Sequence, residues 1–224
     1  MTSTRVIILL GGDAPDPRVR HLIPTDAYVI AADRGVDHAL ALGLLIDLAV
    51  GDMDSVSLAG LAHLQQERIR TERHPTDKEA SDGELAIDAA LQQRPDEVYI
   101  VCGGGQDRFD HLMITAALLT HPLLAGREVT AYLGDTMIVP VQSGERRQFV
   151  GQRDATVTLL AVNGPAVGVT TTGLTFALND ETLQPWSSRG LSNRIESDVT
   201  LCSVSVQRGA LLIIRPDALR DVPI

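Results

Sequence analysis

The sequence predicts an α/β N-terminal domain, built as an open parallel sheet with helices on both faces, followed by a C-terminal antiparallel β-sandwich. Two observations predict this class. Strand-like and helix-like segments alternate over the first 140 residues, a pattern typical of parallel sheets covered by helices. Short β-rich segments separated by turn residues take over after about residue 145, as in sandwiches. The length of 224 residues suffices for one large or two small domains.

Four short apolar segments of the N-terminal part predict buried strands that end at glycine or aspartate. They are residues 6–10, 28–32, 48–50 and 98–102. Helical patterns follow them at 36–44, 58–66, 81–93 and 110–119. Ser81 with Glu84 three residues later predicts a capping box at the start of the third helix.

The C-terminal part has no long helical period, and four β-rich segments predict its strands. They are residues 155–162, 167–172, 199–206 and 211–214. Turn residues separate them at 163–165, 179–180 and 208–209. The segment 141–152, rich in Gly, Arg and Gln, is the predicted linker. We therefore expect an α/β domain over 1–143 and a β-sandwich domain over 144–224.

The charge balance restricts the partners. With 19 Lys and Arg against 29 Asp and Glu, the net charge of −10 disfavours non-specific binding to nucleic acid or anionic lipid. The N-terminus lacks the pattern of a signal peptide, and no apolar segment is long enough for a membrane span. We expect a cytoplasmic protein. Cys102 and Cys202 lie in apolar segments, which predicts reduced thiols.

Aspartates follow the predicted strands at the edge where open α/β sheets bind ligands. Asp33 follows the second strand, and Asp52 and Asp54 follow the third. Side chains two residues apart point the same way in an extended loop, so Asp52 and Asp54 can share one cation. Aspartate is also common in turns, so this motif alone leaves both interpretations open.

Two further loops add charge to that edge. Segment 76–82 surrounds Lys78 with acids just before a predicted helix, where a solvated helix start is the alternative interpretation. Gly103-Gly104-Gly105 lets backbone N–H groups approach an anion, and Arg108 can add a bidentate phosphate contact. Together the loops predict a Mg²⁺ site of oxygen ligands beside a phosphate cradle. The spacing fits neither a Walker A nor a dinucleotide fingerprint, and no Cys/His cluster suits zinc.

The order and spacing of these motifs resembles the thiamine pyrophosphokinase family. Gly51-Asp52-Met53-Asp54-Ser55 fits the family's Gly-Asp-x-Asp-Ser motif at every fixed position. The other segments similar to family motifs are 33–35, 77–82, 103–111, 170–176 and 190–193. The resemblance runs from about residue 30 to the C-terminus.

The resemblance implies an enzyme that moves the pyrophosphoryl group of ATP to thiamine, giving AMP and thiamine diphosphate with Mg²⁺ as cofactor. It also implies a homodimer whose active sites are shared between subunits. The residues it implies for catalysis are Asp52, Asp54, Asp77, Lys78 and Asp82, with the four aspartates as metal ligands. Those it implies for ATP binding are Asp33, Gly35, Lys78, Gly104, Arg108, Asp110 and His111. Those it implies for thiamine binding are Phe176, Ser192 and Asn193.

Departures from the family pattern keep two alternatives open. Asp107 replaces the glycine that usually precedes the arginine, Glu79 and Ser81 replace Asp and Thr, and Phe176 stands where Trp is frequent. One alternative is a related pyrophosphokinase that acts on a hydroxymethyl pterin. The other is a non-catalytic nucleotide or thiamine diphosphate sensor of the same fold, which Asp107 favours and the complete set of aspartates disfavours.

Overall fold

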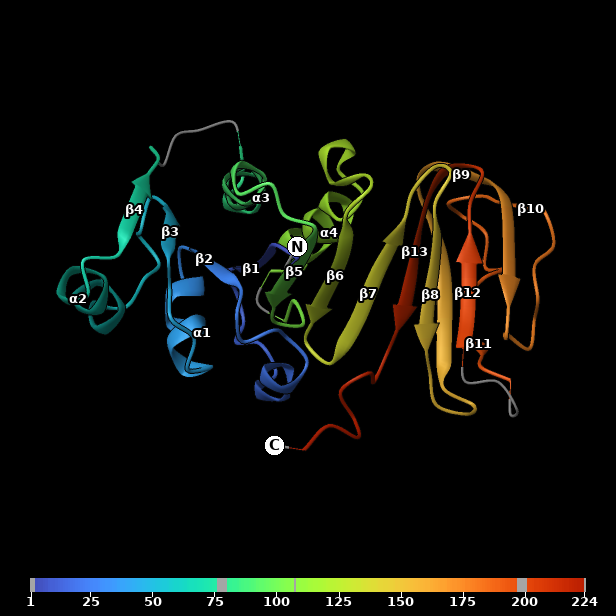
Figure 1. The fold of residues 1–224 in the computed structure, drawn as a ribbon, viewed down its shortest axis with the longest axis horizontal. Helices are drawn as coiled ribbons and strands as arrows, with labels where there is room; N and C mark the ends of the chain where they lie inside the picture. Colours follow the sequence, from blue (N-terminus) through green and yellow to red (C-terminus); the bar gives the residue numbers. More distant parts are fainter. Residues whose placement is uncertain (1–2, 76–79, 107, 197–200, 224) are drawn as a thin grey trace. The chain divides into compact units, whose positions relative to one another are not determined.

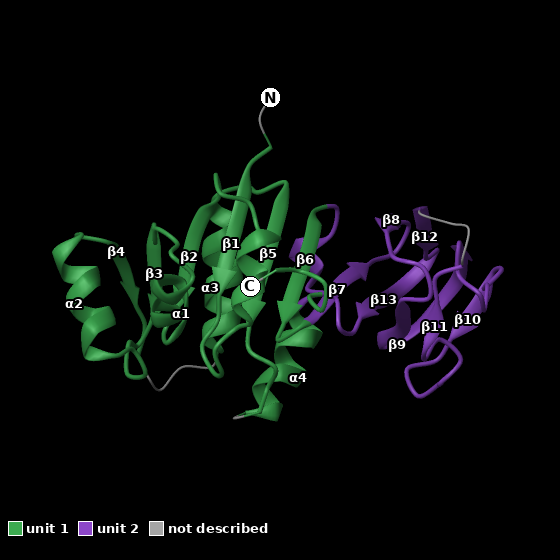
Figure 2. Ribbon diagram, turned by 90° about the horizontal axis from the view of Figure 1, so that it is seen from below, with its two compact units in different colours: residues 1–118, 127–135, 219–224 green, residues 119–126, 136–218 purple. Residues whose placement is uncertain are grey.

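The computed structural model describes residues 3–75, 80–106, 108–196 and 201–223, and Figure 1 shows its fold. The chain forms two compact units, coloured separately in Figure 2. Unit 1 comprises residues 1–118, 127–135 and 219–224, and unit 2 comprises 119–126 and 136–218. The expected boundary after residue 143 lies one strand further along the chain than the change of unit at residue 136.

Unit 1 contains a parallel sheet with the strand order β4-β3-β2-β1-β5-β6. Its strands are β1 (Arg5–Leu9), β2 (Tyr28–Ala32), β3 (Leu48–Gly51), β4 (Arg70–Arg73), β5 (Glu97–Cys102) and β6 (Glu128–Leu133). The central register places Ile8 beside Ile30 of β2 and Ile100 of β5. All three are buried, because a parallel sheet is covered on both faces.

The helices of unit 1 lie on both faces of this sheet, with α3 and α4 on one face and α1 on the other (Figure 1). They are α1 (Gly35–Ala41), α2 (Leu58–Gln66), α3 (Asp82–Gln92) and α4 (Phe109–Leu118), with a 3₁₀ turn η1 (Pro17–His21). The capping box is confirmed: the Glu84 N–H donates to Ser81 Oγ at 3.3 Å, and the Ser81 N–H donates to Glu84 Oε2 at 2.8 Å. The predicted parallel sheet with helices on both faces is confirmed.

Sequence patterns missed β4 and β6. The β4 sequence, Arg-Thr-Glu-Arg, has no apolar alternation because this strand is the edge of the sheet. An edge strand with charged side chains resists pairing with other chains.

Unit 2 is built from antiparallel strands around its own core, as predicted for the C-terminal part. The strands are β7 (Thr136–Val141), β8 (Arg146–Val150), β9 (Thr156–Thr172), β10 (Glu181–Leu183), β11 (Asn193–Arg194), β12 (Leu201–Ser205) and β13 (Arg208–Arg215). The order is β7-β13-β9-β12-β8, and β10 and β11 also pair with β9. Alternate residues such as Val157 and Leu159 of β9 and Leu211 of β13 fill the core. A short 3₁₀ turn, η2 (Pro122–Leu124), also belongs to this unit.

The predicted turn at 163–165 is wrong, because it lies inside the long strand β9. Asn163 and Gly164 have positive φ values of 59° and 132°, so the strand bends there without ending. The first half of β9 pairs with β13 through Thr158–Val162, and the last three residues pair with β12. One strand thereby contributes to several strand pairs of the unit.

The predicted linker 141–152 is also wrong, since it contains β8. This strand pairs with β12 from Arg146–Ser205 to Val150–Leu201, and the Arg146 guanidinium donates to Ser203 Oγ at 3.0 Å. Its composition, Arg-Arg-Gln-Phe-Val, hides the strand because one side of β8 is exposed.

Both cysteines, Cys102 and Cys202, are free and buried in the structure. Among the residues that the structure describes, no helix combines the length and the apolar character that crossing a membrane requires.

Candidate active site

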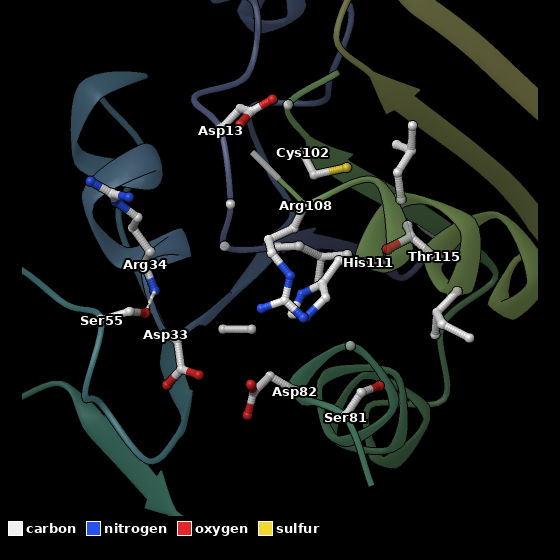
Figure 3. A pocket seen from close by; sticks show the side chains of 18 of the residues that line it. Asp13, Asp33, Arg34, Ser55, Ser81, Asp82, Cys102, Arg108, His111 and Thr115 are labelled. Atoms are coloured by element: carbon white, nitrogen blue, oxygen red, sulfur yellow. Dashed lines mark hydrogen bonds between the residues drawn. The ribbon is translucent and has the colours of Figure 1, made fainter. Parts of the chain in front are cut away.

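A cavity of about 710 Å³ lies in unit 1 at the carboxyl ends of β1, β2, β3 and β5 (Figure 3). The residues that line it come from the loops after these strands and from α3 and α4. They include Gly11, Gly12, Asp13, Asp33, Arg34, Asp52, Asp54, Ser55, Ser81, Asp82, Gly103, Gly105, Arg108, Asp110 and His111. Parallel strands bring loops that are far apart in sequence to one edge, and the predicted acidic edge is therefore a cavity wall.

Three carboxylates form a cluster in this wall. Oxygen atoms of Asp33, Asp52 and Asp54 lie within 4.8 Å of one another. The Met53 N–H donates to Asp33 Oδ1 at 2.9 Å, and the Asp54 N–H donates to Asp52 Oδ1 at 3.0 Å. Asp33 and Met53 both have positive φ values, of 45° and 68°. Backbone strain of this kind is typical of functional loops.

The absence of a side chain at Gly51 makes room for the Asp33 carboxylate. A Cβ at position 51 would overlap Asp33 Oδ1 and Cγ, and Gly51 has a φ of 130°, which L residues rarely adopt. The glycine of the Gly-Asp-x-Asp-Ser motif is therefore required by the packing of an acid from the neighbouring strand.

The electrostatics of Asp33 are unfavourable for a charged group. Burial, a hydrogen bond with Asp82 and the negative charges of Asp82 and Asp52 raise the pKa of the Asp33 carboxyl to about 7. Figure 3 shows Asp33 and Asp82 on the same side of the cavity. Crowded carboxylates repel one another in a buried place, and a divalent cation would relieve this repulsion. The donor set, made only of carboxylate oxygens, suits Mg²⁺.

Arg108 and His111 also line the cavity that contains these acids. Arg108 points into the cavity near His111 (Figure 3). Its guanidinium forms an ion pair with Asp110 at 2.7 Å, and both side chains are more than half exposed. This partner lowers the pKa of the Asp110 carboxyl below its usual range. Exposed ion pairs contribute little stability, so the guanidinium can exchange Asp110 for a phosphate at small cost.

Several residues predicted for this site lie elsewhere or outside the described residues. Gly35 and Gly104 do not line the cavity. A Cβ at Gly35 would overlap the Leu9 carbonyl, so this glycine lets α1 pack closely on β1. Asp77 and Lys78 lie outside the described residues, as do Glu79 and Asp107.

Sequence reasoning missed the first loop of the cavity. Gly11, Gly12 and Asp13 follow β1 and line the cavity wall. The sequence contains a signal for this loop, because Gly-Gly-Asp follows a predicted strand just as the other glycine- and aspartate-containing loops do.

Two other lining residues, Arg34 and Ser55, connect the loops after β2 and β3. The Arg34 N–H donates a hydrogen bond to Ser55 Oγ at 3.2 Å.

The residues predicted for thiamine binding lie in unit 2, and the structure gives them different surroundings. Phe176 is 53% exposed, whereas Asn193 is 1% exposed. The Asn193 amide donates to the Phe176 carbonyl at 2.9 Å and accepts from the Phe176 N–H at 2.9 Å. Ser192 is exposed, and its N–H donates to Thr158 Oγ1 at 3.1 Å. Asn193 therefore holds the backbone of Phe176 in place.

A parallel sheet with a carboxylate cluster and glycine-containing loops at its carboxyl edge, followed by an antiparallel unit, describes an α/β protein with an acidic cavity at the edge where such sheets bind ligands. Residues 19–131 match the catalytic domain of thiamin pyrophosphokinase, and residues 146–211 match its vitamin B1 binding domain. The chain belongs to the thiamin pyrophosphokinase family and is an enzyme, a thiamine diphosphokinase.

Solved structures of the family share the fold over nearly the whole chain. Thiamine pyrophosphokinase from Bacillus subtilis is 20% identical with a TM-score of 0.81, covering 95% of this chain and 99% of that one. The family protein from Enterococcus faecalis is 25% identical with a TM-score of 0.76, covering 95% and 99%. Thiamin pyrophosphokinase from Candida albicans is 14% identical with a TM-score of 0.76, covering 96% and 90%. No curated protein sequence matches this chain.

Proposed function

We propose that this enzyme transfers the pyrophosphoryl group of ATP to the hydroxyl of thiamine, with Mg²⁺ as cofactor, and releases AMP and thiamine diphosphate. The observation that carries the proposal is the carboxylate cluster of Asp33, Asp52 and Asp54 in the wall of a cavity large enough for a nucleotide. Most residues that line the cavity, those from Ala32 to Leu118, lie within the segment 19–131 that matches the catalytic domain.

Asp33, Asp52 and Asp54 would hold Mg²⁺. Asp82, which is hydrogen-bonded to Asp33, is a further candidate ligand, and family resemblance adds Asp77. The fit rests on the clustered oxygen atoms and on the space that Gly51 leaves for Asp33. When bound, the cation neutralises phosphate charge and aligns the phosphates. Arg108 would leave Asp110 for a phosphate oxygen, with His111 beside it, and family resemblance adds Lys78. Gly35 and Gly104, also predicted for ATP binding, do not line the cavity and are not part of the proposed site.

The reaction needs little covalent chemistry from the protein. The thiamine hydroxyl oxygen attacks the β-phosphorus of ATP in line, and the bond from that phosphorus to the oxygen bridging it to the α-phosphorus breaks. AMP leaves with the electron pair, and the hydroxyl proton passes to a nearby carboxylate. The side chains of the cavity act by positioning the two substrates and by balancing charge.

Unit 2 supplies the thiamine-binding residues in this proposal. Phe176 presents an exposed ring on which a cationic heterocycle can stack. Ser192 offers an exposed hydroxyl. The Asn193 side chain holds the backbone of Phe176 through two hydrogen bonds. Unit 1 is the ATP and Mg²⁺ domain, and the residues after 143 form the thiamine-binding and dimerisation domain.

We also propose a cytoplasmic homodimer whose active sites combine residues of both subunits, with no role for nucleic acid or membrane. Mixing subunits tests the shared site. Asp54→Asn subunits mixed with Phe176→Ala subunits should recover activity after proven exchange. Failure to recover would place each site within one chain.

The first experiment incubates the purified protein with ATP, Mg²⁺ and thiamine and measures AMP and thiamine diphosphate. Equal amounts of the two products are expected. A parallel sample with a hydroxymethyl pterin tests the related pyrophosphokinase. Binding of ATP or thiamine diphosphate without any product would instead identify a sensor and contradict the proposal.

A further inference from the structure

A hydrogen bond across 93 positions of sequence joins two loops of the cavity: the Gln106 N–H donates to Asp13 Oδ2. Asp13 belongs to the loop after β1, and Gln106 to the glycine-rich loop after β5. This hydrogen bond ties the end of the glycine-rich loop to the loop that follows β1. The contact therefore sets the position of that loop relative to the sheet.

Close packing of the same two loops supports this interpretation. A Cβ at Gly103 would overlap the Cβ, carbonyl carbon and carbonyl oxygen of Asp13. Asp13 thus lies directly against the backbone where the glycine-rich loop begins. Asp13 also acts electrostatically on Cys102, the last residue of β5. Burial and the negative charge of Asp13 together raise the pKa of the Cys102 thiol to about 12.

Asp13 is separate from the carboxylate cluster. The group of carboxylates close enough to share a cation, among the described residues, consists of Asp33, Asp52 and Asp54. Figure 3 shows Asp13 beside Cys102, with Arg108 between it and the pair formed by Asp33 and Asp82. A carboxylate placed there faces the loop of the phosphate cradle and not the metal site.

We infer that Asp13 is a positioning residue that holds the 103–106 loop in the conformation that receives the nucleotide phosphates. The inference rests on the proposed function for the identity of the nucleotide. A hydrogen bond to a carboxylate is stronger than one between neutral groups, and a loop ordered before binding loses less conformational entropy when the ligand arrives. Asp13 would act through the loop backbone without touching the substrate.

The test compares Asp13→Ala with Asp13→Asn in the full-length enzyme. Asparagine keeps an acceptor oxygen and removes the charge, whereas alanine removes both. Asp13→Ala should raise the KM for ATP about tenfold, the size expected when a charge-assisted hydrogen bond is lost, and leave the KM for thiamine unchanged. Asp13→Asn should restore most of the ATP affinity. Asp88→Ala, which removes one exposed acid from α3 outside the cavity, is the control for net charge.

Hydrogen exchange at the Gln106 amide gives a second measurement that needs no ligand or turnover. Exchange should be faster in Asp13→Ala and close to wild type in Asp13→Asn. This measurement decides the inference even if wild-type enzyme yields no thiamine diphosphate, which would count against the proposed function alone.

Two results would overturn the inference. If Asp13→Asn is as impaired as Asp13→Ala while its Gln106 amide stays protected, the charge itself contacts a ligand. If Asp13→Ala binds ATP more tightly than wild type, the carboxylate competes with phosphate for the loop and does not prepare it.

Discussion

The cavity of unit 1 and the Phe176 segment of unit 2 achieve order in opposite ways. In the cavity, acids from the loops after β2 and β3 and from the start of α3 crowd together, and the pKa of Asp33 rises to about 7 because burial and neighbouring charges oppose ionisation. In unit 2, the buried Asn193 amide makes hydrogen bonds with both backbone groups of Phe176. The first arrangement opposes the ionisation of Asp33, whereas the second satisfies the hydrogen-bonding groups that it brings together.

The two arrangements suit the two roles proposed for these regions, phosphoryl transfer in unit 1 and thiamine binding in unit 2. Where carboxylates repel one another, a bound cation relieves the repulsion, and this relief adds to the binding free energy of the cation. A site that binds an aromatic cation gains from a ring held in a fixed position.

Asp54→Asn should lower kcat at least about 100-fold, because a metal site stabilises transition-state charge by several kcal/mol. The measurement is thiamine diphosphate formation at saturating ATP and Mg²⁺. The thermal unfolding temperature without Mg²⁺ should not fall, since the change relieves repulsion. Asp88→Asn is the matched control on the exposed side of α3. Activity near wild type would remove Asp54 from the metal site.

Gly51→Ala should destabilise the enzyme by more than about 2 kcal/mol, because the new Cβ overlaps the Asp33 carboxylate and the backbone has a φ of 130°. Urea unfolding measures the effect. Gly43→Ala provides a control with positive φ and open space around the position. Equal losses in both variants would show that backbone conformation alone is responsible.

Asp33→Asn should change how stability depends on pH. The folded-state pKa of about 7 lies above the ordinary 3.8, so the folded protein retains a proton that the unfolded chain loses. This contribution to stability is complete below about pH 4 and disappears as the pH rises through about 7. In EDTA, wild type should therefore lose up to about 1.4 kcal/mol per pH unit within that window relative to Asp33→Asn. Parallel curves for the two proteins would contradict the crowding of these acids.

Asn193→Ala should raise the KM for thiamine about tenfold and leave the KM for ATP unchanged, because it removes the hydrogen bonds that hold Phe176. A double-mutant cycle with Phe176→Ala sharpens the test. If Asn193 acts through Phe176, its replacement should have little further effect once the ring is absent. Additive effects would instead indicate that Asn193 contacts thiamine directly.

Local sequence patterns predicted most of unit 1 correctly. Apolar segments that end at glycine or aspartate located four of its six strands, and the Ser81–Glu84 capping box located the start of α3. They failed for β4 and β8, whose polar sequences reflect exposed positions, and for the bend of β9 at Asn163. A turn-forming pair such as Asn-Gly specifies a backbone conformation, but the strands on either side decide whether the chain reverses.

The alternation of strands and helices, the aspartates at the strand ends and the family that they resemble can all be read from local sequence patterns. Which of these residues meet depends on the folded arrangement of the sheet. It placed Asp33 against Asp82, gave Gly51 its role, joined Asp13 to Gln106 and turned Asn193 inward to hold Phe176. Local patterns report the conformation of neighbouring residues. Contacts between residues distant in sequence depend on strand order and register, which are set by packing of the whole sheet.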